Sequence, residues 1–193
     1  MPVQIEGIDF SLFADRDRAN LERLSFGGRV DWFERRFNRM LVGPLERLRP
    51  TGRGGHEDDL WTLLVFGTVL LSAMEALGSF CSTAASNRAR FEAFVQTFMP
   101  QSYQNHLGTL WSFRNSLTHG LTVETGSFEF FDGTPVKIQD DSVAIDPDSL
   151  FRDFIFAWDA FLDAVRGAEL ESPIRVAFEL RFADRYKVPR CSV

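Results

Sequence analysis

The sequence predicts a mainly helical protein with a small β-sheet in its C-terminal third. Apolar residues recur at helical spacing in several stretches before residue 121 and again after residue 147. Between these stretches, short alternating runs are bounded by turn residues, which is typical of strands. With 193 residues and 45% hydrophobic content, the chain can bury a substantial core. We therefore expect one helical domain over residues 1–193.

The N-terminal third is predicted to hold a short helix around 16–24 and a longer one over 31–49. The apolar face of the longer helix is formed by Phe33, Phe37, Met40, Leu41, Leu45 and Leu48. Pro44 is expected to kink or break this helix, because proline has no backbone N–H group to donate. Glycines in residues 49–56 then indicate a flexible loop.

Residues 60–86 are predicted to form a long buried helix that begins at Asp58 or Asp59. Glu75 is the single charged residue between positions 60 and 87. A membrane span needs about 20 apolar residues. Here Glu75, the glycines and many Ser and Thr residues dilute the run, so burial by neighbouring helices is the favoured interpretation, with no membrane partner. Further helices are expected from Asn87 to Pro100 and over 102–119.

The C-terminal third is predicted to begin with a β-hairpin insertion at about 123–146. Its short strands, expected at 127–131, 136–138 and 143–145, would form a small antiparallel sheet. An amphipathic helix follows, so that the core helices cover about 31–121 and 148–166. Residues 174–182 alternate as a strand would, whereas Ser172-Pro173 is typical of a helix start. The alternation favours a strand that joins the sheet.

Charge and cysteine content restrict the class of protein. The net charge of −6 and the pI of about 5.1 argue against a protein that coats nucleic acid non-specifically. Residues 29–53 contain seven arginines and three acids, and residues 124–163 contain ten acids and two basic residues. One basic face for RNA phosphates and one acidic face for a basic partner would explain these blocks, and so would ordinary solvated surfaces.

The two cysteines, Cys81 and Cys191, show no disulfide framework and no zinc-ligand spacing. The first residues lack the basic and apolar regions of a signal peptide. Both observations favour a reducing, cytoplasmic location.

Arg114 occupies an unexpected position in the helix predicted over 102–119. The apolar stripe of this helix consists of Leu107, Leu110, Phe113, Leu117 and Leu121. At about 100° per residue, Arg114 falls within the stripe, while Asn115 and His119 share the adjacent flank. A guanidinium on an apolar face is costly unless an ion-pair partner or an anionic ligand compensates its charge.

Glu75 is the expected partner of Arg114, because it is a lone carboxylate in an equally apolar helix. If the two helices pack together, Glu75 orients the guanidinium and Arg114 keeps the carboxylate ionised. A structural ion pair without chemistry is an alternative. Such a pair, however, does not call for an amide and an imidazole alongside.

Arginine, asparagine and histidine within one and a half turns suit metal-independent cleavage of RNA. Arg114 can bind a phosphate through two N–H groups, His119 can transfer a proton near neutral pH, and Asn115 can orient either partner. Arg114 and His119 are about 140° apart on an ideal helix. Arg114 must therefore reach across, or the last turn must loosen. His56, His106 and His119 share no metal-ligand spacing, so we expect neither metal nor cofactor.

The run Phe-Arg-Asn-Ser-Leu-Thr-His-Gly-Leu at 113–121 resembles the signature of the HEPN superfamily. The resemblance covers about 60–121 and implies a bundle of four to five helices. It also implies that Arg114 and His119 are the catalytic pair, that Asn115 assists them, and that Glu75 is the acidic residue from a preceding helix.

Many HEPN proteins are metal-independent endoribonucleases of toxin–antitoxin or defence systems. The resemblance thus implies RNA as substrate, a homodimer whose two motifs share one cleft, and a separate antitoxin protein as a partner. Arg53 and His56 are weaker candidates for substrate contact. The alternative function is a non-catalytic HEPN-like module that binds a nucleotide or a protein partner, because some members of the superfamily lack nuclease activity.

Overall fold

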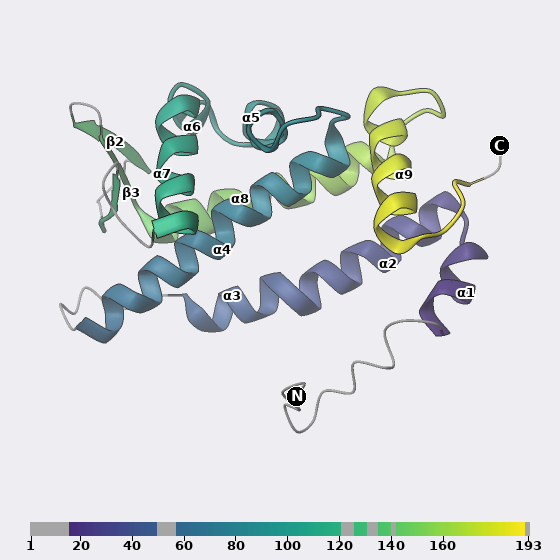
Figure 1. Cartoon of the computed structure of the whole chain (residues 1–193), viewed down its shortest axis with the longest axis horizontal. Coiled ribbons are helices and arrows are strands. Elements are labelled where there is room, and N and C mark those ends of the chain that lie inside the picture. The colour runs from purple at the N-terminus through teal and green to yellow at the C-terminus, as the bar shows by residue number, and fades with distance from the viewer. Residues whose placement is uncertain (1–15, 50–56, 121–125, 131–134, 140–141, 192–193) are drawn as a thin grey trace.

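The computed structural model describes residues 16–49, 57–120, 126–130, 135–139 and 142–191, and it confirms a mainly helical fold with a small sheet in the C-terminal third. Helix α4, Glu57–Cys81, runs diagonally through the centre of the molecule (Figure 1). Helices α5, Asn87–Phe98, α7, Leu107–Gly120, and α9, Pro173–Tyr186, pack against it. Helix α8, Pro147–Arg166, passes behind it in the view of Figure 1. The weaker site candidates Arg53 and His56 lie outside the described residues.

Helix α4 is buried over most of its circumference, as its apolar sequence predicts. Its buried residues include Leu63, Leu64, Phe66, Leu70, Leu71, Met74, Leu77 and Phe80. The stretch Trp61–Cys81 is long and apolar enough to cross a membrane by length and composition, and 61% of its most apolar window is buried inside the fold. Such burial is typical of the core helix of a soluble protein.

The predicted N-terminal helices are present. After α1, Arg16–Glu22, a helical rod consists of α2, Phe26–Phe37, the π-helical turn η2, Asn38–Val42, and α3, Gly43–Leu48. Ser25 caps α2 by accepting a hydrogen bond from the Gly28 N–H group at 3.2 Å. The predicted interruption at Pro44 takes the form of this π turn. In it the Gly43 N–H group bonds to the Asn38 carbonyl, and Pro44 follows in the first turn of α3, where its missing donor leaves no gap.

The helix predicted over 102–119 is divided in two. A single turn of helix, α6, Gln101–Gln104, is followed by a turn at residues 105 and 106 and then by α7. The His106 N–H group bonds to the Tyr103 carbonyl three residues back rather than to the residue four back, which tightens the chain before α7 begins.

The small sheet contains β1, Gly126–Phe128, β2, Val136–Gln139, and β3, Ser142–Ile145, in the order β1-β3-β2. Strands β2 and β3 form the predicted antiparallel hairpin, with Ile138 opposite Val143. Strand β1 pairs with β3 in parallel. The sheet is therefore mixed, whereas the sequence predicted a purely antiparallel sheet.

The prediction of a strand over 174–182 is wrong, because these residues belong to helix α9. Phe178 and Phe182, four residues apart, are fully buried, whereas Val176 is exposed. Phe178 packs edge-on against Phe33 of α2, with the two ring centroids 5.5 Å apart. Pro173 lies in the first turn of α9, as in the alternative interpretation of Ser172-Pro173.

Candidate functional site

Arg114 of α7 and Glu75 of α4 form an ion pair, which confirms the predicted pairing of the two lone charges. The bond joins Nη2 of Arg114 to Oε2 of Glu75, and the two side chains are 11% and 15% exposed. Helices α4 and α7 are in contact. An ion pair so little exposed is screened weakly by solvent and salt, so each charge depends on the other.

The remaining contacts of Arg114 come from its own helix. Its Nη1 atom donates a hydrogen bond to Oδ1 of Asn115 at 3.1 Å. Its guanidinium carbon lies 5.2 Å from the ring centroid of Trp111, which also packs on Phe91 of α5. The Nε atom is buried and has no hydrogen-bond partner among the described residues. The guanidinium is thus held by a carboxylate, an amide and an indole.

Trp111 is a contact residue of the site that the sequence analysis did not single out. It precedes Arg114 by three positions and so lies on the same side of the helix. This spacing was the available signal. A tryptophan ring over a guanidinium stabilises the cation and restricts its orientation.

His119 does not join Arg114 within one chain. Helix α7 continues to Gly120, so its last turn does not loosen. Loosening was one of the two ways in which Arg114 and His119 were expected to meet. In this last turn the Oγ1 atom of Thr118 donates to the Arg114 carbonyl at 2.8 Å. His119 is exposed to solvent, about 140° around the helix from Arg114, and Asn115 lies between the two positions.

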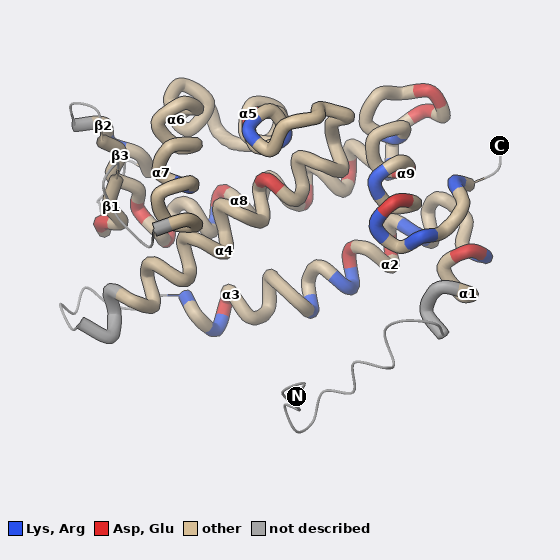
Figure 2. Tube along the Cα trace, in the orientation of Figure 1, with Lys and Arg blue, Asp and Glu red and all other residues tan. Residues whose placement is uncertain are grey.

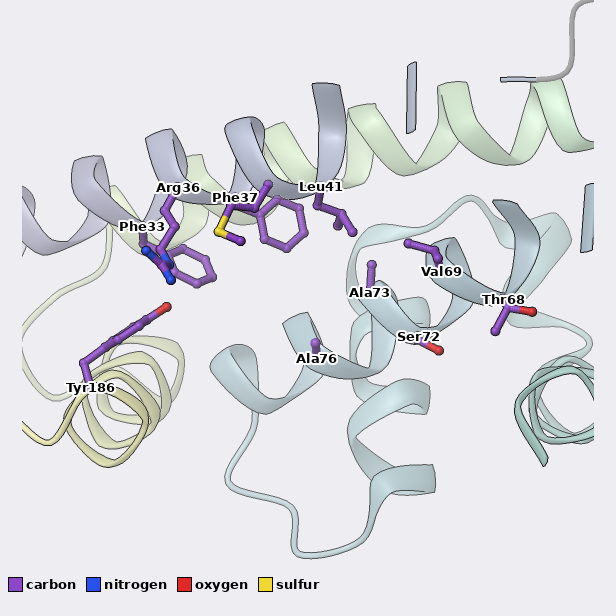
Figure 3. A pocket seen from close by; sticks show the side chains of 11 residues that line it. Phe33, Arg36, Phe37, Leu41, Thr68, Val69, Ser72, Ala73, Ala76 and Tyr186 are labelled. Carbon is purple, nitrogen blue, oxygen red and sulfur yellow. The ribbon is translucent and has the colours of Figure 1, made fainter. Parts of the chain in front are cut away.

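A groove of about 450 Å³ lies between α4 and the rod formed by α2 and η2 (Figure 3). On α4 its polar lining is Thr68 and Ser72, and neither Glu75 nor Arg114 lines it. Its other walls are mostly apolar, with Arg36 and Tyr186 near one end. The groove suits an apolar group better than a phosphate.

The two charge blocks of the sequence are not separate faces. Arg49 at the end of α3 bonds to Asp148 of α8 at 2.9 Å. Arg166 at the end of α8 bonds to Glu34 of α2 at 2.6 Å. Basic and acidic side chains are accordingly interspersed along α2, α3 and α8 (Figure 2). Part of each block stabilises the packing of these helices and is not free for a charged partner.

Across the part of the chain that the structure describes, no three His, Cys, Asp or Glu side chains gather as a possible metal site. Comparison with models of known protein families gives no match, and no curated protein or solved structure is significantly similar to this chain.

Proposed function

We propose that this protein is a metal-independent endoribonuclease of the HEPN type, acting in the cytoplasm within a toxin–antitoxin or defence system. The observation that supports the proposal best is the convergence of Glu75, Arg114 and Asn115 from α4 and α7 at one point. The HEPN resemblance assigns catalytic roles to these three residues and to His119.

In the proposed reaction the ribose 2′-oxygen attacks the adjacent phosphorus atom and the 5′-oxygen leaves. The products are a 2′,3′-cyclic phosphate and a 5′-hydroxyl. His119 transfers the proton of the attacking or leaving oxygen, and Arg114 stabilises the charge that develops on the phosphate. Asn115 and Glu75 position the guanidinium through the contacts already described.

We propose a homodimer with a shared cleft, and the positions of Arg114 and His119 support it. Because these residues occupy different sides of one unbroken helix, we propose that Arg114 of one copy and His119 of the other act on the same phosphate. Exposed apolar side chains support a contact between copies. Met40, Trp61 and Val65 are 57%, 55% and 47% exposed, respectively.

The test is incubation of the protein with assorted RNAs in the presence of a chelator, followed by analysis of the product ends. We expect 2′,3′-cyclic phosphate ends from the wild-type protein and none from a His119→Ala variant. The matched control is His106→Ala, which removes a histidine from the turn before α7 and should leave cleavage unchanged. Cleavage that persists in the His119→Ala variant would refute the role of His119.

A second candidate function is a non-catalytic HEPN-like module that binds a nucleotide or a protein partner, such as an antitoxin. The low exposure of Arg114 and Glu75 favours it, because a buried ion pair can stabilise the crossing of α4 and α7 without touching a substrate. RNA binding without cleavage, unaffected by His119→Ala, would support this function over the first.

A further inference from the structure

A second pocket lies at the other end of the molecule from the small sheet, beside α9 (Figure 1). It has a volume of about 270 Å³ and lies between the segment after α4, the start of α5 and one side of α9. Its polar lining consists of Ser79, Ser82, Thr83, Arg90, Arg181 and Asp184. It shares no residue with the Arg114–Glu75 site, so what it binds is independent of the proposed nuclease activity.

Arg90 is fixed in this pocket by its neighbours. Its Nε atom donates to the Ala84 carbonyl at 2.8 Å, and its Nη1 atom donates to Oδ1 of Asn87 at 3.4 Å. Its backbone packs directly against α4. A Cβ atom on Gly78 of α4 would lie only 1.9 Å from the Arg90 carbonyl oxygen, which shows how close the two backbones are. A guanidinium has five N–H groups, so Arg90 retains donors for a ligand without having to move.

Arg181 approaches the pocket from α9 with a donor that the described residues do not satisfy. Its Nη1 atom is 3.4 Å from Oδ2 of Asp184, whereas its Nε atom is buried and has no hydrogen-bond partner among them. A buried donor left without an acceptor is destabilising, particularly on a charged group. The Arg181 side chain as a whole is 34% exposed where it lines the pocket, and its guanidinium has further N–H groups beyond the one that points to Asp184.

The other polar groups leave the pocket suited to an anion. Ser82 accepts a hydrogen bond from the Ala84 N–H group at 3.1 Å, so its hydroxyl proton is available to a ligand. Asp184 is the one carboxylate in the polar lining, and Lys187 bonds to it at 3.1 Å. Arg181 and Lys187 both lie against Asp184, so the charge of this carboxylate is already compensated, while Arg90 has no carboxylate partner among the described residues.

We propose that this pocket binds a phosphate group, either as the free ion or as the phosphate of a small monoester. Two arginine side chains and a hydroxyl donor match the several acceptor oxygens of phosphate, and arginine binds phosphate through paired N–H groups. Pockets for drug-sized ligands begin at about 300 Å³, so this volume favours a ligand smaller than a nucleotide.

The experiment is calorimetric titration of the full chain with inorganic phosphate, and in a second arm with methyl phosphate. We expect saturable binding in the wild-type protein and a loss of about tenfold or more in an Arg181→Gln variant. Arg185→Gln, which removes an exposed arginine of the same helix, is the matched control and should bind as the wild type does. Tighter binding of methyl phosphate would identify a monoester site, and tighter binding of inorganic phosphate a site for the free ion.

A second measurement needs no substitution. In the wild-type protein labelled with ¹⁵N-arginine, phosphate should shift the Nε–Hε resonance of Arg181 and leave that of Arg185 in place. The proposal is overturned if wild-type protein shows no saturable binding up to about 10 mM phosphate, or if both variants bind equally. It is also overturned if the Arg181 resonance does not respond.

Discussion

The Arg114 guanidinium on α7 is bonded to the Glu75 carboxylate on α4, and each is the other's counter-charge in a largely apolar environment. The consequence is mutual dependence. Removal of one partner leaves an uncompensated charge at the crossing of two core helices, whereas removal of both does not.

A Glu75→Gln variant should therefore lose on the order of 3 kcal/mol of unfolding free energy, measured by urea denaturation. The double variant Glu75→Met with Arg114→Met should recover most of this loss, because two apolar side chains of similar size fill the same space. The control is Glu92→Gln, which breaks the Arg88–Glu92 pair, where the arginine is 58% exposed. It should change stability by no more than about 0.5 kcal/mol. Equal effects of the two single substitutions would contradict a buried pair.

Gly78 and Gly108 predict opposite effects of the same substitution. Alanine stabilises a helix interior relative to glycine by up to about 1 kcal/mol. A Cβ atom on Gly108 of α7 has no neighbour within 4 Å, so Gly108→Ala should be neutral or stabilising. At Gly78 it would meet the Arg90 carbonyl oxygen at 1.9 Å and would force α4 and α5 apart. Gly78→Ala should therefore destabilise the protein by about 1–3 kcal/mol. A stabilising Gly78→Ala substitution would show that the two helices are farther apart.

The two cysteines should differ in reactivity. Burial raises the pKa of the Cys81 thiol to about 12. Burial also raises the pKa of Cys191, and Arg29 opposes part of that shift. Because a higher pKa leaves less thiolate at a given pH, roughly one Cys81 in ten thousand is ionised at pH 8. Iodoacetamide should label Cys191 first, as measured by mass spectrometry, with urea-unfolded protein as the control in which both react alike. Faster labelling of Cys81 would contradict its burial.

The Arg114–Glu75 pair was predictable because each residue is a lone charge in an apolar helix. Burying such a charge is costly unless an opposite charge compensates it, so each residue indicated the other as its partner. Helices α4 and α8 were also predictable, because each has a long apolar pattern and a clear starting residue. These signals are local to the sequence. They required no knowledge of which helix packs against which.

Helix α9 was not predictable in the same way. An alternating pattern over nine residues fits a strand, but it also places Phe178 and Phe182 on one side of a helix. The contact of Phe178 with Phe33 of α2 decides between strand and helix. The parallel pairing of β1 with β3 likewise depends on the path of the chain between these strands, which the local sequence pattern does not specify. The separation of His119 from Arg114 depended on whether α7 unwinds before Gly120, and α7 stays helical to that residue.

A shared cleft would make two inactive variants complement each other. Arg114→Lys keeps a positive charge beside Glu75 but loses the planar fork that binds a phosphate, and His119→Ala removes the proton-transfer group. The shared cleft holds two composite sites, each with Arg114 of one copy and His119 of the other. In a mixed dimer, one of these two sites has both residues intact.

Cleavage of RNA in chelator by the two variants, alone and after refolding together, is the most direct measurement. Our account predicts no cleavage by either variant alone and roughly a quarter of the wild-type rate for the mixture, since half of the dimers are mixed and one of the two composite sites in each is intact. A mixture as inactive as its components, formed from dimers that demonstrably exchange, would contradict the shared cleft. RNA cleavage by either variant alone at the wild-type rate would contradict the nuclease assignment of that residue.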